Sequence, residues 1–206
     1  MQIGTQWGTA VAEVDDAAAP AFLLVLTHGA GGGVASADLL AVRRAALVAG
    51  AAVARVTQPY RVAGARAPGS PQRQDEAWLE AVCALRKDRP GVPLVQGGRS
   101  NGARLACRTA RSAGAVAVIA LAFPLHPPGK AADPERSRAA ELRGAGVPVL
   151  VINGDRDPFG VPDAADADRV VVLAGQTHAL SRRPGEITDA VASWLPGVLA
   201  AGSFRG

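Results

Sequence analysis

The stretch 94-LVQGGRSNGARLACR-108 runs from apolar residues through three glycines around one serine into residues that favour a helix. Its centre, 98-GRSNG-102, matches G-x-S-x-G, the nucleophile elbow, in which a sharp strand-to-helix turn exposes a strained serine hydroxyl. Side chains at the two flanking glycines would collide with a neighbouring strand or helix. The chain has 24 glycines, so a chance match to this motif is common. Taken alone, Ser100 could equally be an ordinary helix N-cap. The stretch therefore predicts a strand–turn–helix unit, and a nucleophile only if catalytic partners occur elsewhere.

Apolar, β-branched runs alternate with longer amphipathic segments along the chain. The apolar runs predict strands at 9–14, 22–27, 52–57, 93–97, 116–121, 147–153 and 169–174. The segments between them predict helices near 36–49, 73–88, 101–113, 135–145 and 184–196. Continuous apolar strands separated by helices indicate an α/β fold, a three-layer α/β/α sandwich around a mostly parallel sheet. Because no internal repeat or dividing linker is present, we expect residues 1–206 to form a single domain.

Composition narrows the class of protein. Hydrophobic residues make up 49% and charged residues 19% of the 206, as in a soluble globular protein. The formal charge is +4, but 20 of the 22 basic residues are Arg, scattered among acidic residues without a basic stripe. Arg104, Arg108 and Arg111 recur at helical spacing, which predicts a solvated helix face. We therefore expect no nucleic-acid partner.

Other features of the sequence concern cellular location, metal binding and redox chemistry. The N-terminus has acidic residues and no basic segment typical of a secretory signal. The apolar runs are far shorter than the roughly 20 residues of a membrane span, so we expect no membrane association. Cys83 and Cys107 lie in separate helix-like segments without metal or redox spacing. These features predict a cytoplasmic protein with two reduced cysteines and no metal.

A serine, an aspartate and a histidine follow successive predicted strands. A serine hydroxyl needs a base that takes its proton and a third group that orients the base. Ser100, Asp157 and His178 occur in the order Ser…Asp…His, each after its own strand, at the sheet edge where parallel sheets bind ligands. Asp157 is preferred to Asp155 because it lies further out on the loop and precedes Pro158; Asp155 is more simply a turn residue.

The glycine-rich loop 29-GAGGG-33 also follows a predicted strand and can turn backbone N–H groups toward this edge. The expected oxyanion donors are the N–H of Asn101 and one from Ala30 or its neighbour. The competing interpretation is a dinucleotide-binding loop. Position 34 is Val, no G-x-G-x-x-G occurs here, and the strand ending near Arg55 lacks an acid for the ribose, although an arginine could suit NADP. We therefore expect no organic cofactor.

Six motifs occur in chain order: THGAGG, QPYRVAGARAP, GGRSNGAR, FPLHPPGK, NGDRDPFG and GQTHAL. With these motifs the chain resembles the α/β hydrolases over residues 20–196, in particular the small dienelactone-hydrolase-like proteins of the KANL/Tex type. The resemblance implies that Ser100 is the nucleophile, Asp157 the acid and His178 the base, with the HGAGG loop as part of the oxyanion hole. The residue after the serine is usually Met in this group. Here it is Asn101, which keeps the backbone donor but would alter the pocket.

Four further residues near the predicted strand ends are candidate substrate contacts. His28 directly follows a strand, and Tyr60 and Arg61 could stand at the rim, where they would meet an anionic substrate group. His126 also follows a strand but precedes Asp157, outside the triad order. For His126, a substrate contact and a structural hydrogen bond in a proline-rich loop are both open.

The leading interpretation is a serine hydrolase that cleaves an ester, thioester or related acyl bond of a small substrate through an acyl-enzyme. Only about 25 residues separate the strand ending at Leu121 from the next strand, and part of them must form a helix. We therefore expect a minimal fold without a lid domain, as a monomer or homodimer with a small-molecule acyl substrate. The alternative, from a different class, is a non-catalytic interaction module that retains the fold.

Overall fold

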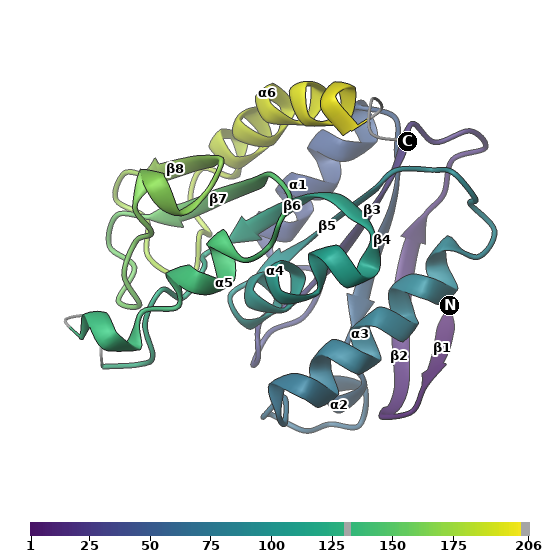
Figure 1. Cartoon of the computed structure of the whole chain (residues 1–206), viewed down its shortest axis with the longest axis horizontal. Helices are drawn as coiled ribbons and strands as arrows, with labels where there is room; N and C mark the ends of the chain where they lie inside the picture. The colour runs from purple at the N-terminus through teal and green to yellow at the C-terminus, as the bar shows by residue number, and fades with distance from the viewer. Residues whose placement is uncertain (130–132, 203–206) are drawn as a thin grey trace.

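The structure, a computed structural model, describes residues 1–129 and 133–202, and one eight-stranded sheet runs through that part of the chain (Figure 1). Its strands are β1 (Gln2–Thr5), β2 (Gly8–Asp15), β3 (Phe22–Thr27), β4 (Ala51–Thr57), β5 (Leu94–Arg99), β6 (Ala115–Leu121), β7 (Val149–Gly154) and β8 (Arg169–Leu173). Their order in the sheet is β1-β2-β4-β3-β5-β6-β7-β8. The β1–β2 and β2–β4 pairs are antiparallel, and the pairs from β4 through β8 are parallel.

Helices cover both faces of the sheet, which makes the predicted three-layer sandwich (Figure 1). The helices are α1 (Ala37–Val48), α2 (Pro59–Val62), α3 (Pro71–Arg86), α4 (Asn101–Ala113), α5 (Ala139–Arg143) and α6 (Pro184–Gly202), with short 3₁₀ turns at Pro134–Arg136 and Ala164–Asp166. α1 and α6 pack on one face, and α3 and α4 pack on the other. The predicted α/β fold class is therefore confirmed.

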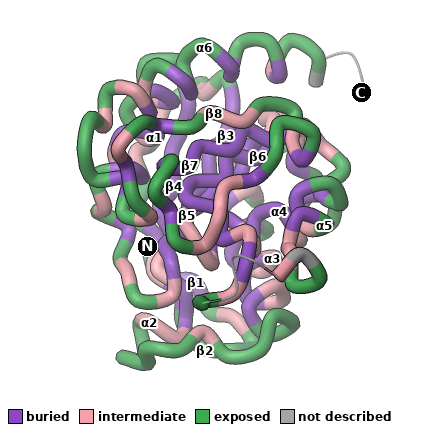
Figure 2. The backbone as a smooth tube through the Cα atoms, turned by 90° about the vertical axis from the view of Figure 1, so that its left-hand side faces the viewer, coloured by how far each residue is buried: buried purple, intermediate pink, exposed green. Residues whose placement is uncertain are grey.

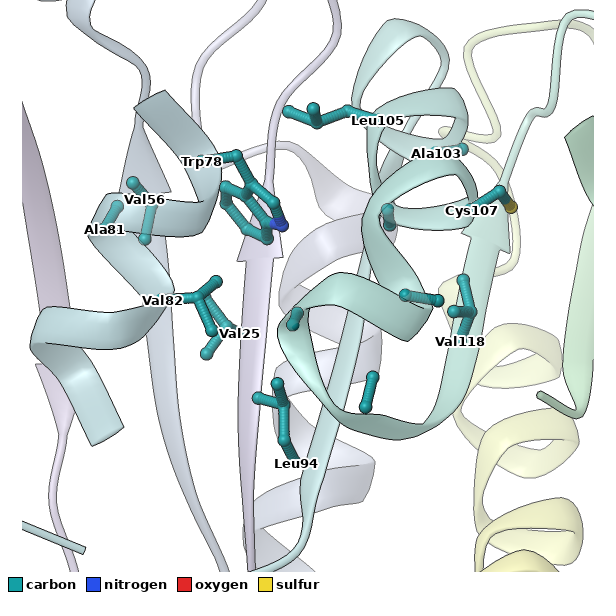
Figure 3. Close-up of a cluster of buried hydrophobic side chains, with 14 of the residues drawn as sticks. Val25, Val56, Trp78, Ala81, Val82, Leu94, Ala103, Leu105, Cys107 and Val118 are labelled. Atoms are coloured by element: carbon teal, nitrogen blue, oxygen red, sulfur yellow. The ribbon is translucent and has the colours of Figure 1, made fainter. Parts of the chain in front are cut away.

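The core consists of two apolar layers, one on each side of the sheet. Successive residues of a strand point to opposite faces, so Leu23 and Val25 of β3 pack toward Trp78 of α3, whereas Leu24 packs toward α1 and α6. Figure 3 shows part of the first of these layers, in which Trp78 and Val82 of α3 pack in the same cluster as Val25 of the sheet. Figure 2 shows that the central strands are buried. Because both faces of these strands are covered, their residues form continuous apolar runs in the sequence. Each fully buried Leu contributes about 1.5–3 kcal/mol to folding.

Most predicted elements are present, with three differences. β1 and α2 were not predicted; both have only four residues. The helix expected near 135–145 is shortened to α5 because the Arg138 N–H donates to the Leu125 carbonyl and ties the chain back before the helix begins. Lys130, the last residue of the FPLHPPGK motif, lies outside the described residues.

The prediction of a solvated arginine face on α4 holds only for Arg111, which is exposed. Arg104 forms an ion pair with Glu141 of α5, and Arg108 forms one with Asp75 of α3, so these side chains are only 20% and 17% exposed. The expectation is wrong for both residues because the carboxylates come from neighbouring helices that helical spacing cannot reveal.

The connection between β6 and β7 contains little secondary structure among the described residues. Between β6 and β7, the described residues hold only a 3₁₀ turn and α5, and the described part of the chain contains no lid domain. Among residues 1–129 and 133–202, no helix has both the length and the apolar character needed to cross a membrane. The parallel strands β3, β5, β7 and β8 all end at one edge of the sheet, where the loops that follow them meet.

Candidate active site

Ser100 occupies the turn between β5 and α4 in a backbone conformation that side chains rarely adopt. Its φ is 54° and its ψ is −116°. Such a conformation costs on the order of 1–3 kcal/mol for a residue other than glycine and persists only where the surroundings enforce it. Here the Ser100 N–H donates to the Leu121 carbonyl of β6 at 2.8 Å, and the Ser100 carbonyl accepts from Ala103 and Arg104 in the first turn of α4. The turn is therefore held from both sides.

The glycines on either side of Ser100 allow a close approach of backbone segments. A Cβ atom at Gly98 would lie 2.6 Å from the carbonyl carbon of Gly102 and 2.9 Å from the carbonyl oxygen of Thr27. A Cβ atom at Gly102 would lie 2.6 Å from the carbonyl oxygen of His28. These contacts involve backbone atoms, which cannot move aside as a flexible side chain can. The collisions predicted from the sequence are therefore confirmed.

The structure brings Ser100, His178 and Asp157 into one hydrogen-bonded chain. Nε2 of His178 lies 2.9 Å from Oγ of Ser100, and Nδ1 of His178 lies 2.8 Å from Oδ2 of Asp157. The Asp157 side chain is fully buried, and its Oδ1 accepts from the N–H of Phe159 at 2.9 Å. An ionised Asp157 therefore favours the His178 tautomer with its proton on Nδ1, which leaves Nε2 free to accept the serine proton.

Asp155 lies at the same strand end but does not occupy this position. Its side chain is exposed, and its N–H donates to the Leu173 carbonyl of β8 at 3.2 Å. The Phe159 ring meets the His178 ring edge-on, with 4.5 Å between the ring centroids, so the loop that carries Asp157 also packs against the imidazole.

Two backbone segments with N–H groups lie close to Ser100. The first intrahelical acceptor of α4 is the Ser100 carbonyl, so the N–H groups of Asn101 and Gly102 precede the first helical hydrogen bond and need another partner. The loop after β3 lies beside the serine, since a Cβ atom at Gly29 would be 3.2 Å from Cβ of Ser100. The Ala30 carbonyl accepts from the Tyr60 hydroxyl at 3.1 Å. Asn101 directly follows Ser100, and Gly29, which precedes Ala30, approaches Ser100 from a different element.

His28 is fully buried beneath the glycine-rich loop. Its Nε2 accepts from the N–H of Gln58 at 3.0 Å, so its Nδ1 donates to the carbonyl of Gly29 at 2.8 Å. Burial lowers the pKa of His28, and the neutral ring is the form that both contacts require. This geometry gives His28 a supporting role in place of the substrate contact expected from the sequence.

Tyr60, Arg61 and His126 occupy different positions around the site. Tyr60 is half-buried, and burial raises its pKa to about 12, so its hydroxyl remains a donor to Ala30. Arg61 donates to the carbonyl of Ala65 at 3.2 Å. His126 is 8% exposed, and its N–H donates to the Phe159 carbonyl at 2.8 Å. The His126 backbone therefore braces the loop of Asp157, in line with the structural alternative for this residue.

A family model described as an alpha/beta hydrolase domain matches residues 20–182, which span the sheet from β3 to β8 and include Ser100, Asp157 and His178. The chain belongs to the α/β hydrolase family. A search of curated proteins returned no match.

Solved structures share the fold of this α/β hydrolase. Est1E from Butyrivibrio proteoclasticus, solved with ferulic acid, has a TM-score of 0.78 at 19% identity and covers 97% of this chain and 99% of its own. The Xanthomonas campestris protein XC6422, described as an α/β serine hydrolase without a lid, has a TM-score of 0.72 at 20% identity over 100% and 93%. Dienelactone hydrolase from Anabaena variabilis has a TM-score of 0.71 at 16% identity over 96% and 95%. At these identities the likeness establishes the fold alone.

Two polar pairs in this α/β hydrolase were missed at the sequence level. Arg99 donates from Nη2 to the His178 carbonyl at 2.8 Å, and its Nε lies 2.8 Å from Oδ2 of Asp38, whose side chain is fully buried at the start of α1. Asn101 donates from Nδ2 to Oε1 of Gln74 on α3 at 2.7 Å. Neither pair has a sequence signal, because Asp38, Gln74 and the elbow come from separate parts of the chain.

In the part of the chain that the structure describes, no group of three or more His, Cys, Asp or Glu side chains is arranged so that it could hold a metal ion. Cys107 is buried within α4, which raises the pKa of its thiol, and Cys83 is exposed on α3.

Proposed function

We propose that this α/β hydrolase is a serine hydrolase that cleaves an ester, thioester or related acyl bond of a small substrate through an acyl-enzyme. The observation that carries the proposal is the continuous contact from Ser100 Oγ to His178 Nε2 at 2.9 Å and from His178 Nδ1 to Asp157 at 2.8 Å. A hydroxyl, a base and an orienting carboxylate within hydrogen-bonding distance are the parts that nucleophilic catalysis requires.

Acylation begins when His178 takes the Ser100 proton as Oγ attacks the substrate carbonyl carbon. The carbonyl π electrons move to oxygen, which becomes an oxyanion beside the N–H groups of Asn101 and Ala30. The buried Asp157 carboxylate stabilises the imidazolium and holds its orientation. His178 then donates the proton to the leaving oxygen or sulfur, and the bond between this atom and the carbonyl carbon breaks. One oxyanion donor contributes on the order of 10²–10³ to kcat.

Deacylation reverses these roles with water. His178 takes a proton from water, the hydroxide oxygen attacks the acyl carbon, and the second oxyanion collapses as the bond to Ser100 Oγ breaks. The proton returns to Oγ, which restores the enzyme and releases the carboxylic acid. The short β6–β7 connection supports an open site for small substrates. We further propose that the protein acts in the cytoplasm as a monomer or homodimer without a cofactor.

Initial rates of p-nitrophenyl acetate hydrolysis test this function. Ser100→Ala should lower kcat by about 10⁴-fold or more, because removal of the nucleophile leaves only oxyanion stabilisation and substrate binding. Ser112→Ala is the matched control, since Ser112 lies exposed at the other end of α4. A wild-type enzyme no faster than Ser100→Ala would refute the proposal.

A further inference from the structure

A pocket of about 170 Å³ lies beside the candidate site, between α2, α3 and the β1–β2 hairpin. These elements are neighbours at one side of the molecule in Figure 1. Much of the pocket wall is apolar and comes from Trp7, Pro59, Ala67, Pro68 and Ala77. A larger pocket of about 660 Å³ includes Ser112 and Ala113 at the far end of α4, whereas Ser100 precedes the first residue of that helix. Of these two pockets, the smaller one is therefore nearer to the start of α4, where Ser100 lies.

Three polar residues of the pocket wall are hydrogen-bonded to groups that surround the nucleophile. Gln74 accepts from the side chain of Asn101 at 2.7 Å. Tyr60 donates to the carbonyl of Ala30 at 3.1 Å. The pocket wall is therefore in direct contact with both residues of the predicted oxyanion hole.

The third link runs through Gln58, whose N–H donates to Nε2 of the buried His28 at 3.0 Å. His28 in turn bonds the Gly29 carbonyl in the loop beside Ser100. His28 therefore links the pocket wall to the glycine-rich loop through two hydrogen bonds.

The outer wall of the pocket is an aromatic surface held in place by its neighbours. The guanidinium of Arg73 lies 4.5 Å from the centre of the Trp7 ring, and Nε1 of Trp7 donates to Glu76 at 2.7 Å. The N–H of Gln6 donates to Glu80 of α3 at 2.8 Å, which ties the hairpin to the helix. These contacts fix an indole ring that is 39% exposed at the tip of a hairpin. A rigid, partly apolar wall suits a flat apolar group better than a flexible polar one.

We propose that this pocket is an acyl-group subsite that selects esters whose acyl part carries one ring-sized apolar group, such as a phenyl ring. The proposal rests on the proposed hydrolase function. An apolar cavity of about 150 Å³ is large enough to bind benzene, so a pocket of about 170 Å³ has room for one six-membered ring.

The arrangement around the reacting carbon assigns the pocket to the acyl side. The leaving group must lie next to His178, which protonates it, and the carbonyl oxygen must face Asn101 and Ala30. The pocket is lined by Trp7 and by residues between Gln58 and Ala77. None of its lining residues comes from the loops of Asp157 or His178. A group in the pocket is therefore on the side away from the leaving group.

Two isomeric esters separate the acyl side from the leaving-group side: methyl phenylacetate carries the ring in its acyl part, and benzyl acetate carries it in its alcohol. The measurement is kcat/KM for each ester relative to methyl acetate, in the wild type and in Ala67→Phe. Ala67 lies in an exposed loop and lines the pocket, so the new ring should fill the pocket without disturbing the core. Ala65→Phe, on the same loop and outside the pocket lining, is the matched control.

We expect Ala67→Phe to lower the methyl phenylacetate ratio at least tenfold, whereas Ala65→Phe keeps the wild-type ratio. An unchanged methyl phenylacetate ratio in Ala67→Phe, or a loss confined to benzyl acetate, would overturn the acyl subsite. Failure of the hydrolase proposal is distinguishable, because methyl acetate and p-nitrophenyl acetate would then show no turnover that depends on Ser100.

Discussion

Arg99 connects the turn of Ser100 to the loop of His178, because its Nη2 donates to the His178 carbonyl at 2.8 Å. The other side of the guanidinium lies 2.8 Å from the fully buried carboxylate of Asp38. Arg99 directly precedes Ser100, so one side chain ties together β5, the start of α1 and the loop after β8. We interpret Arg99 as a positioning residue that keeps His178 within reach of Ser100.

Replacement of Arg99 should separate its structural and positioning contributions. Arg99→Ala leaves the Asp38 carboxylate buried without a countercharge, which should lower the free energy of unfolding by about 3–5 kcal/mol. Arg99→Lys keeps a positive charge near Asp38 but cannot reach Asp38 and the His178 carbonyl together. Arg99→Lys should therefore recover much of the stability in urea titrations and still lower kcat by on the order of 10–100-fold. Wild-type kcat in a folded Arg99→Lys protein would contradict the positioning role.

The two aspartates at the end of β7 should differ sharply in their effect on catalysis. Asp157→Asn removes the acceptor that holds the His178 tautomer and should lower kcat for p-nitrophenyl acetate by about 10⁴-fold. Asp155→Asn should leave kcat near the wild-type value, because Asp155 is exposed and Asp157 contacts the imidazole. The reverse result, an inactive Asp155→Asn with an active Asp157→Asn, would transfer the acid role to Asp155.

Two glycine substitutions should change stability in opposite directions. At Gly98 the added methyl would meet backbone atoms of Gly102 and Thr27 within 3 Å, so Gly98→Ala should destabilise the fold by about 1–3 kcal/mol. Gly197 is exposed within α6 with no atom near the added methyl, so Gly197→Ala should stabilise by about 0.5–1 kcal/mol. Urea denaturation measures both, and a stable Gly98→Ala protein would contradict the close packing of the elbow.

His28 should contribute a specific pH dependence to stability. Burial lowers its pKa below the ordinary 6.5, so the unfolded chain takes up a proton before the folded chain does as the pH falls. The contribution of neutral His28 is therefore fully present above pH 6.5 and decreases below it, by at most about 1.4 kcal/mol per pH unit. Urea titrations should show that the stability difference between wild type and His28→Gln narrows from pH 7.5 to 5.5. A difference independent of pH would show that His28 is not held neutral.

The central sheet and the elbow could be predicted from the sequence because their physical requirements are local. Parallel strands buried on both faces need continuous apolar residues, and the tight turn around Ser100 excludes side chains at Gly98 and Gly102. β1 was missed because it is a four-residue edge strand whose burial alternates, with Ile3 facing the core.

The remaining differences have a common origin in tertiary contacts. Arg108 appeared to belong to a solvated face, yet Asp75 of α3 pairs with it. His28 follows β3 as a ligand-binding residue would, but its ring turns inward to Gln58. Neither partner is near in sequence, so residue type and spacing carry no information about these contacts.

The most direct test of the proposed nucleophile is covalent labelling with a fluorophosphonate, followed by mass spectrometry of the peptide that contains Ser100. We predict that the wild-type protein is modified once, at Ser100 Oγ, and that His178→Ala reacts far more slowly because its serine lacks the base. Ser100→Ala should remain unmodified. A folded wild-type protein that stays unlabelled, or that is labelled at another residue, would contradict the proposal that Ser100 is an activated nucleophile.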